Sequence, residues 1–193
     1  MPLGANKVAL YGASADTGTA VLLSTATASN DASIEFTLPT AYKQVKFGFY
    51  NITPATDHTS LQFQVNASGQ TGYNETITST FFQAYHAEDD SATSLAYGTT
   101  HDQAQGTGYQ TIADTIGNAS DECTVGELSL FNPASTTYVK HFYGRTNQYD
   151  SAPYTVDSYP AGYINNTAVI SEIAFKFSSG NISSGTIKMW GIK

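Results

Sequence analysis

The sequence predicts an all-β protein, a single antiparallel β-sandwich that is jelly-roll-like, with long loops and an N-terminal arm. Three observations support this fold class. Apolar and polar residues alternate in short runs, which is the pattern of strands with one buried face. Aromatic residues that favour strands are abundant, with 13 Tyr and 10 Phe among 193 residues,. Gly, Pro and Asn separate the runs, as they do at turns.

Residues 1–30 differ in composition from the rest and are expected to form an N-terminal arm or edge strand, followed by the sandwich in residues 31–193. Short strands are expected at residues 6–12 and 21–23, separated by Ala, Ser, Thr and Gly. Two interpretations stay open. The segment is either an edge strand with a mobile loop or an arm that orders against a neighbouring subunit.

Regular alternation begins at Ser33, and strands are expected at residues 34–38, 45–49, 61–65 and 76–85,. The next stretch, residues 87–120, is polar and contains glycine. It is therefore expected as one long excursion, with a short helix or strand near residues 111–116.

The second half of the chain predicts four more strands, at residues 125–131, 138–143, 169–177 and 186–192. A second polar excursion, residues 144–166, lies between them and is rich in tyrosine. The total of about eight antiparallel strands fits a jelly roll or a related two-sheet sandwich.

The closing strand carries apolar side chains on both faces, because Ile187 and Met189 alternate with Trp190,. This pattern predicts a central position in its sheet or an edge that is covered, with residues 8–11 as the candidate cover. Trp190 is expected to behave as a buried aromatic residue. The end of the chain is accordingly expected to be tied into a sheet.

Charge and composition exclude several function classes. The net charge is −8 and Arg145 is the only arginine, so the chain lacks the clustered basic residues that bind nucleic acid,. No apolar run is long enough to predict a membrane span. Cys123 is the only cysteine, and the N-terminal sequence does not resemble a signal peptide, so we expect synthesis and assembly in a cytoplasm,.

The sequence gives no positive sign of catalysis, of a metal or of a cofactor. The four histidines, His58, His86, His101 and His141, have no partner at the spacing of metal ligands,. There is no G-x-S-x-G motif and no glycine-rich phosphate loop. Cys123 follows two acidic residues, which disfavour a reactive thiolate,. We therefore expect a protein that is not an enzyme.

The best candidate for recognition is the tyrosine-rich excursion. Tyr149, Tyr154, Tyr159 and Tyr163 offer flat apolar rings with polar tips, which suit sugar stacking or a protein interface,. The alternative is structural: the rings cover the open ends of the sandwich.

Four segments of the chain form recognisable motifs: Leu-Pro-Thr-Ala-Tyr-Lys-Gln-Val (38–45), Leu-Gln-Phe-Gln-Val-Asn-Ala-Ser (61–68) with Gly-Tyr-Asn (72–74), Gly-Glu-Leu-Ser-Leu-Phe-Asn-Pro-Ala-Ser (126–135), and the closing Gly-Thr-Ile-Lys-Met-Trp-Gly-Ile (185–192). With these motifs, roughly residues 33–193 resemble a diffuse family of structural proteins from tailed, especially marine, bacteriophages, the β-sandwich head decoration or fibre proteins. Such proteins usually close on Tyr-Gly-Ile, and Trp190 stands here in place of the tyrosine. The resemblance implies a virion component on the head or tail and carries no catalytic residues.

The leading hypothesis is a non-enzymatic bacteriophage virion structural protein, a capsid decoration or cement protein on the particle surface. Its expected partners are the major capsid protein or other virion proteins and further copies of itself, with a trimer as one option. The expected location is the virion, assembled in the host cytoplasm. The alternative is a receptor- or glycan-binding tail or head fibre domain that uses the four tyrosines on a host glycan. An enzyme such as a polysaccharide depolymerase has the least support.

Overall fold

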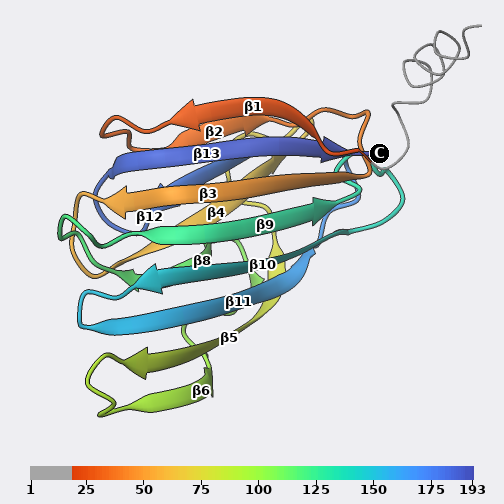
Figure 1. Ribbon diagram of the computed structural model, residues 1–193. Coiled ribbons are helices and arrows are strands. Elements are labelled where there is room, and N and C mark those ends of the chain that lie inside the picture. Colours follow the sequence, from red (N-terminus) through yellow and green to blue (C-terminus); the bar gives the residue numbers. More distant parts are fainter. Residues whose placement is uncertain (1–18) are drawn as a thin grey trace, which may run out of the picture.

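Two antiparallel β-sheets pack face to face in the computed structural model, which describes residues 19–193 (Figure 1). In Figure 1 the larger sheet faces the viewer, from β1 at the top to β6 at the bottom, and the smaller sheet lies behind it. The predicted all-β, antiparallel sandwich is confirmed.

The larger sheet has nine strands, which run in the order β1 (Val21–Thr27), β13 (Ile182–Ile192), β3 (Gln44–Pro54), β9 (Thr124–Phe131), β10 (Lys140–Tyr149), β11 (Tyr154–Ile164), β5 (Ile77–Ala87) and β6 (Thr93–Tyr97), with the short β7 (Ala104–Gly106) also paired to β5. The smaller sheet has four strands, in the order β2 (Ile34–Thr37), β12 (Ile170–Phe177), β4 (Thr59–Ala67) and β8 (Gln110–Ile116). Every strand pair is antiparallel.

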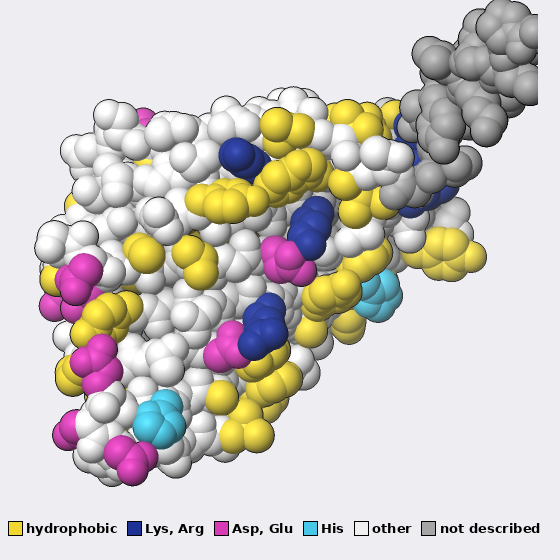
Figure 2. Space-filling view, viewed as in Figure 1, with side chains coloured by type: hydrophobic (Ala, Val, Ile, Leu, Met, Phe, Trp, Pro, Cys, Tyr) yellow, Lys and Arg dark blue, Asp and Glu magenta, His cyan; other side chains and the backbone are white. Residues whose placement is uncertain are grey.

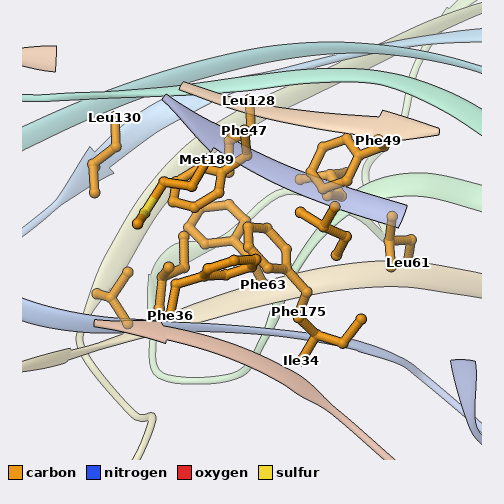
Figure 3. Packing of buried hydrophobic residues seen from close by; sticks show 14 of the residues in the cluster. Ile34, Phe36, Phe47, Phe49, Leu61, Phe63, Leu128, Leu130, Phe175 and Met189 are labelled. Atoms are coloured by element: carbon orange, nitrogen blue, oxygen red, sulfur yellow. The ribbon is translucent and has the colours of Figure 1, made fainter. Parts of the chain in front are cut away.

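The core lies between the facing sides of the two sheets and contains a cluster of phenylalanine rings among aliphatic side chains (Figure 3). Phe47 of β3 and Phe63 of β4 are fully buried, as is Phe175 of β12. The Phe175 ring packs edge-on against Phe47 at a centroid distance of 5.1 Å and against Phe49 at 5.3 Å. Burial of each such side chain contributes about 1.5–3 kcal/mol, so this cluster fixes which faces of the two sheets meet.

Polar side chains extend this contact where β10 passes over β8. The Thr146 hydroxyl donates to the Ile112 carbonyl oxygen at 2.7 Å, and the Gln148 amide donates to the Asp114 carbonyl oxygen at 2.9 Å. Both donors are buried. The larger sheet is therefore joined to the smaller one by side-chain hydrogen bonds here, in addition to apolar packing.

Two predicted polar excursions contain strands, so the prediction of long loops is wrong for both. Residues 144–166 lie mostly in the β10–β11 hairpin. The prediction missed β10 because its inward positions from Gly144 onward are glycine and hydrogen-bonded polar residues, which show no apolar alternation. Residues 87–120 contain β6, β7 and β8. The strand expected near residues 111–116 is present as part of β8.

The closing strand β13 is central rather than an edge, since it lies between β1 and β3. Its outer neighbour is β1, which falls within the predicted N-terminal segment and forms the edge of the larger sheet. The strand expected at residues 6–12, and with it the proposed cover by residues 8–11, lies outside the described residues. Trp190 is expected from the sequence to behave as a buried aromatic residue, but it is only half-buried, on the outside of the sheet.

Candidate interaction surface

The most distinctive surface is the side of the larger sheet that points away from the smaller sheet, which we name the outer face. Its side chains alternate with buried ones: Lys46 and Tyr50 point outward, whereas Val45, Phe47 and Phe49 are buried. The same alternation holds in the neighbouring strands. Figure 2 looks onto this face and shows hydrophobic side chains interleaved with Lys, Arg, Asp and Glu.

Exposed large hydrophobic residues concentrate on this sheet. Within the part of the chain that the structure describes, they are Val21, Leu22, Tyr50, Phe82, Leu95, Tyr97, Val125 and Tyr143, with Tyr138 as the single one outside the sheet's strands. Leu95 is the most exposed, at 74%. Single exposed apolar residues need no explanation, but a series on one sheet marks an interaction surface.

The upper part of the outer face is built around Trp190. Its ring lies 6.4 Å from that of Tyr50, and the Lys188 amine lies 5.3 Å from the centre of the Tyr50 ring. Gly48 makes room for this arrangement, because a Cβ atom there would lie 2.8 Å from Cζ3 of Trp190. The glycine thus lets an indole lie across the sheet.

The lower part is built around an ion pair between β10 and β11. The Arg145 guanidinium donates to both carboxylate oxygens of Asp157, at 2.6 Å for the shortest contact. The Tyr159 hydroxyl also donates to Asp157, at 2.5 Å. The Arg145 guanidinium lies 5.4 Å from the centre of the Tyr159 ring, and Phe82 of β5 stacks on that ring at 4.8 Å and 9°.

These contacts set the electrostatics of the outer face. Burial alone raises the pKa of Asp157, but hydrogen bonds from Arg145 and Tyr159 outweigh it and hold the pKa below its usual value,. The same hydrogen bond to Asp157 raises the pKa of Tyr159. A second ion pair joins Lys46 to Glu127. The Asp157 carboxylate is therefore ionised at neutral pH, and both carboxyl side chains of this face lie beside basic side chains.

A hollow of about 440 Å³ lies on the outer face between β10, β11 and β5. Its sides include His141, Tyr143 and Tyr163, whereas Ala161 supplies a small side chain. Thr80 adds a hydroxyl group. The hollow thus combines aromatic rings and polar groups, and it is shallow and open to solvent.

The four tyrosines predicted as a recognition surface do not lie on one surface. Tyr159 and Tyr163 share the outer face. Tyr154 contacts Tyr85 edge-on at 5.7 Å, and both alternate with outward-pointing residues, so they lie on the opposite side of the sheet. Tyr149 ends β10, where a hydrogen bond to Glu88 raises its pKa.

The sequence interpretation missed Tyr50, Phe82 and Arg145 as surface residues. One signal was available, the adjacent pair Phe81–Phe82. Two consecutive aromatic residues in a strand place one ring on each face, and Phe81 is fully buried whereas Phe82 is 41% exposed,.

Two polar clusters place a histidine close to a serine or a carboxylate. The His101 ring lies 2.9 Å from an Asp114 oxygen, and Ser60 donates to the other oxygen of the same carboxylate. The carboxylate thus holds both groups, and the serine donates its proton away from the imidazole. His58 bonds Ser151 at 2.7 Å on exposed loops. Neither cluster has the serine–histidine–carboxylate order of a nucleophile relay.

Residues 19–193 contain no group of three or more His, Cys, Asp and Glu side chains placed to hold a metal ion. The same range contains no helix that is long and apolar enough to cross a membrane. Cys123 is half-buried, and burial raises the pKa of its thiol, which opposes nucleophilic reactivity,.

No protein-family model matches this chain, and no curated protein sequence matches it with statistical significance.

Proposed function

We propose that this chain is a non-enzymatic structural protein of a bacteriophage virion, a capsid decoration or cement protein that docks on the shell through its outer face. The observation that carries the proposal is the concentration of exposed aromatic and aliphatic side chains on one sheet, most of them on its outer face. The sequence resemblance to phage virion proteins supports the same function.

The composition of the outer face suits a protein partner. Tyr, Trp, Phe and Arg are the residue types enriched in the buried centres of interfaces, and this face presents Tyr50, Trp190, Phe82 and Arg145,. Phe82 stacks on Tyr159, and the Trp190 ring lies beside that of Tyr50, so neighbouring rings restrict these side chains before docking. A rigid surface loses little side-chain entropy when a partner covers it.

Charge indicates which kind of surface fits. The strands of the outer face carry three basic side chains, Lys46, Lys188 and Arg145, and two acidic ones, Glu127 and Asp157, a net charge of +1. The whole chain carries −8. The outer face is therefore the side on which an acidic protein surface approaches without repulsion. We assign that partner as the major capsid protein.

The strand order supports a jelly roll as the underlying fold. If the insertions β10–β11 and β5–β7 are set aside, eight strands remain, in the sheet orders β1-β13-β3-β9 and β2-β12-β4-β8. Along the chain, consecutive strands of this set lie in different sheets, except β4 and β8, which pair with each other in the smaller sheet. We infer that these eight strands are two interleaved Greek keys, the arrangement common in viral capsid domains. The insertions then widen the outer face.

Mass spectrometry of purified phage particles tests the proposal. The wild-type chain is expected in the particles, and Leu95→Ser and Tyr50→Ser are expected to lower its copy number tenfold or more, for a loss of about 1.4 kcal/mol or more each. Tyr138→Ser is the matched control, because Tyr138 is 70% exposed but lies outside the strands of this sheet. Absence of the wild-type chain from particles overturns the virion role. Unchanged incorporation of both outer-face variants overturns the docking surface.

A second candidate function is glycan recognition, and the outer-face hollow is the observation that favours it. Aromatic rings beside hydroxyl groups are what a sugar ring stacks on and bonds to, and Tyr143, Tyr163 and Thr80 supply both,. A glycan array with wild type and Tyr163→Ala tests this function, with Tyr138→Ala as the control. Binding lost only in Tyr163→Ala supports it, and no binding by the wild type rejects it.

A further inference from the structure

Three polar side chains gather away from the outer face, at one end of three adjacent strands. Lys140 begins β10 and is paired with Ile164, the last residue of β11, which is paired in turn with Ile77 at the start of β5. Asn166 follows Ile164 by two residues, and Glu75 precedes Ile77 by two residues. The pairing register therefore brings Lys140, Asn166 and Glu75 together.

The contacts within this cluster are specific. The Lys140 amine donates to the main-chain oxygen of Asn166 at 3.0 Å and also to that of Ala168. The Asn166 side-chain amide donates from Nδ2 to Oε2 of Glu75 at 2.7 Å. Its oxygen, Oδ1, accepts from the Ala168 main-chain N–H at 2.7 Å. Asn166 thus accepts from the Lys140 amine through its main-chain oxygen, while both polar atoms of its side-chain amide are hydrogen-bonded.

Lys140 and Glu75 are shielded from solvent, and Asn166 is half-buried beside them. Lys140 is 0% exposed, and Glu75 is 7% exposed with Oε1 accepting from the Ala67 main-chain N–H at 3.0 Å. Burial lowers the pKa of the Lys140 amine, and the charge of Glu75 partly opposes this effect,. A buried lysine with a lowered pKa supplies more of the neutral, nucleophilic amine than an exposed one.

We propose that Lys140 and Asn166 form an intramolecular isopeptide bond, with Glu75 as the catalytic carboxyl group. This inference is independent of the proposed function. It rests on the chemistry of an amine, a carboxamide and a carboxylate brought together in a site sheltered from water.

The reaction balances without any further reagent. The neutral Lys140 amine attacks Cγ of Asn166, a new C–N bond forms, and the bond between Cγ and Nδ2 breaks. One proton passes from the attacking nitrogen through Glu75 to Nδ2, which leaves as ammonia. Nothing is oxidised or reduced.

Each neighbour has a role in this step. The Ala168 N–H bonds the oxygen on which negative charge develops, as a donor in an oxyanion hole does,. Glu75 bonds the nitrogen that must be protonated to leave,. The Asn166 and Ala168 carbonyl oxygens orient the amine.

The bond has a structural use in this chain. With Cys123 as the only cysteine, an internal disulfide is impossible. An isopeptide bond needs no oxidising compartment, and here it links the start of β10 to the segment between β11 and β12. It therefore closes the open end of the β10–β11 hairpin, next to the connection that leads to β12.

Intact-mass spectrometry of the purified wild-type chain tests the proposal first. The expected mass is lower than the sequence mass by one ammonia. Trypsin is then expected to leave Lys140 uncut, so that the fragment ending at Arg145 stays joined to the fragment from Thr146 to Lys176. A full sequence mass overturns the proposal. Loss of ammonia without joined fragments also overturns it, because it indicates a cyclic imide at Asn166.

Variants assign the three roles. Lys140→Met and Asn166→Ala are expected to abolish both the mass loss and the joined fragments, and Glu75→Gln is expected to slow their appearance at least tenfold. Asn165→Ala is the matched control, since the neighbouring Asn165 amide bonds the exposed Gln105 side chain and stays outside the cluster. A joined fragment in Asn166→Ala overturns the assignment of that residue. The wild-type measurement stands even if a variant fails to fold.

Discussion

Substitution of one phenylalanine in the core and one on the outer face by alanine should lower the free energy of unfolding by different amounts. Phe175 is fully buried and packs against three other phenylalanine rings. Phe175→Ala removes these contacts and leaves a cavity, so we expect a loss of about 3–5 kcal/mol. For a chain of this length the loss lowers Tm by about 6–20 °C.

Phe82 gives the matched comparison on the outer face. It is 41% exposed and contacts Tyr159 through one stacked face. Phe82→Ala therefore loses only part of the burial energy and one aromatic pair, about 1–2 kcal/mol in total. The cost is small because solvent already reaches the ring.

Urea unfolding of both variants, followed by fluorescence and by circular dichroism, measures the two costs. A loss below about 1 kcal/mol for Phe175→Ala would refute the core as described, since it is far under the range for a buried aromatic. A loss for Phe82→Ala equal to that for Phe175→Ala would show that the outer face is covered in the free protein.

Three further outcomes are expected. Asp157→Asn removes a carboxylate whose pKa is depressed in the folded state. The stability that this carboxylate contributes is present above its unfolded pKa of about 3.9 and is lost as pH falls through the folded pKa. The free energy of unfolding should therefore fall less steeply with acid in the variant, and an unchanged pH dependence would contradict the pairing. Gly48→Ala places a methyl group against Trp190, so the emission of this single tryptophan should shift to longer wavelength, and an unshifted spectrum would show that the indole lies elsewhere. Thr146→Val leaves the buried Ile112 carbonyl oxygen without its donor and should cost about 1–3 kcal/mol in urea unfolding, whereas a neutral result would place water at that position,.

Apolar alternation made part of the fold predictable from sequence. Val45, Phe47 and Phe49 point to one side of β3, and each is buried in the structure. The strands of the smaller sheet follow the same rule, because their inward positions are filled by large apolar side chains. Where the buried side chains of a strand are apolar, the two-residue period is enough to predict the strand and its buried face.

The β10–β11 hairpin was not predictable in this way. The inward positions of β10 include Gly144, Thr146 and Gln148, which are buried by hydrogen bonding and close backbone packing and not by hydrophobicity. A hydropathy pattern cannot distinguish such a strand from a polar loop, since the partners that satisfy its side chains come from β8, far away in the chain.

The outer face and the Lys140 cluster depend on the pairing register of the strands, which cannot be predicted from hydrophobic alternation. Phe82 and Tyr159 meet because β5 and β11 are paired with these two residues opposite each other. Lys140 and Glu75 come together through two successive pairings across β11. Composition predicted that tyrosines would serve recognition, but only the register shows which of them share a face.

Hydroxyl-radical footprinting of the chain, free and bound to phage particles, tests docking through the outer face most directly. The account predicts that Tyr50, Phe82 and Leu95 are labelled in the free chain and protected on the particle, whereas Tyr138 is labelled equally in both. Unchanged labelling of the three outer-face residues on the particle, or protection of Tyr138 alone, would contradict it.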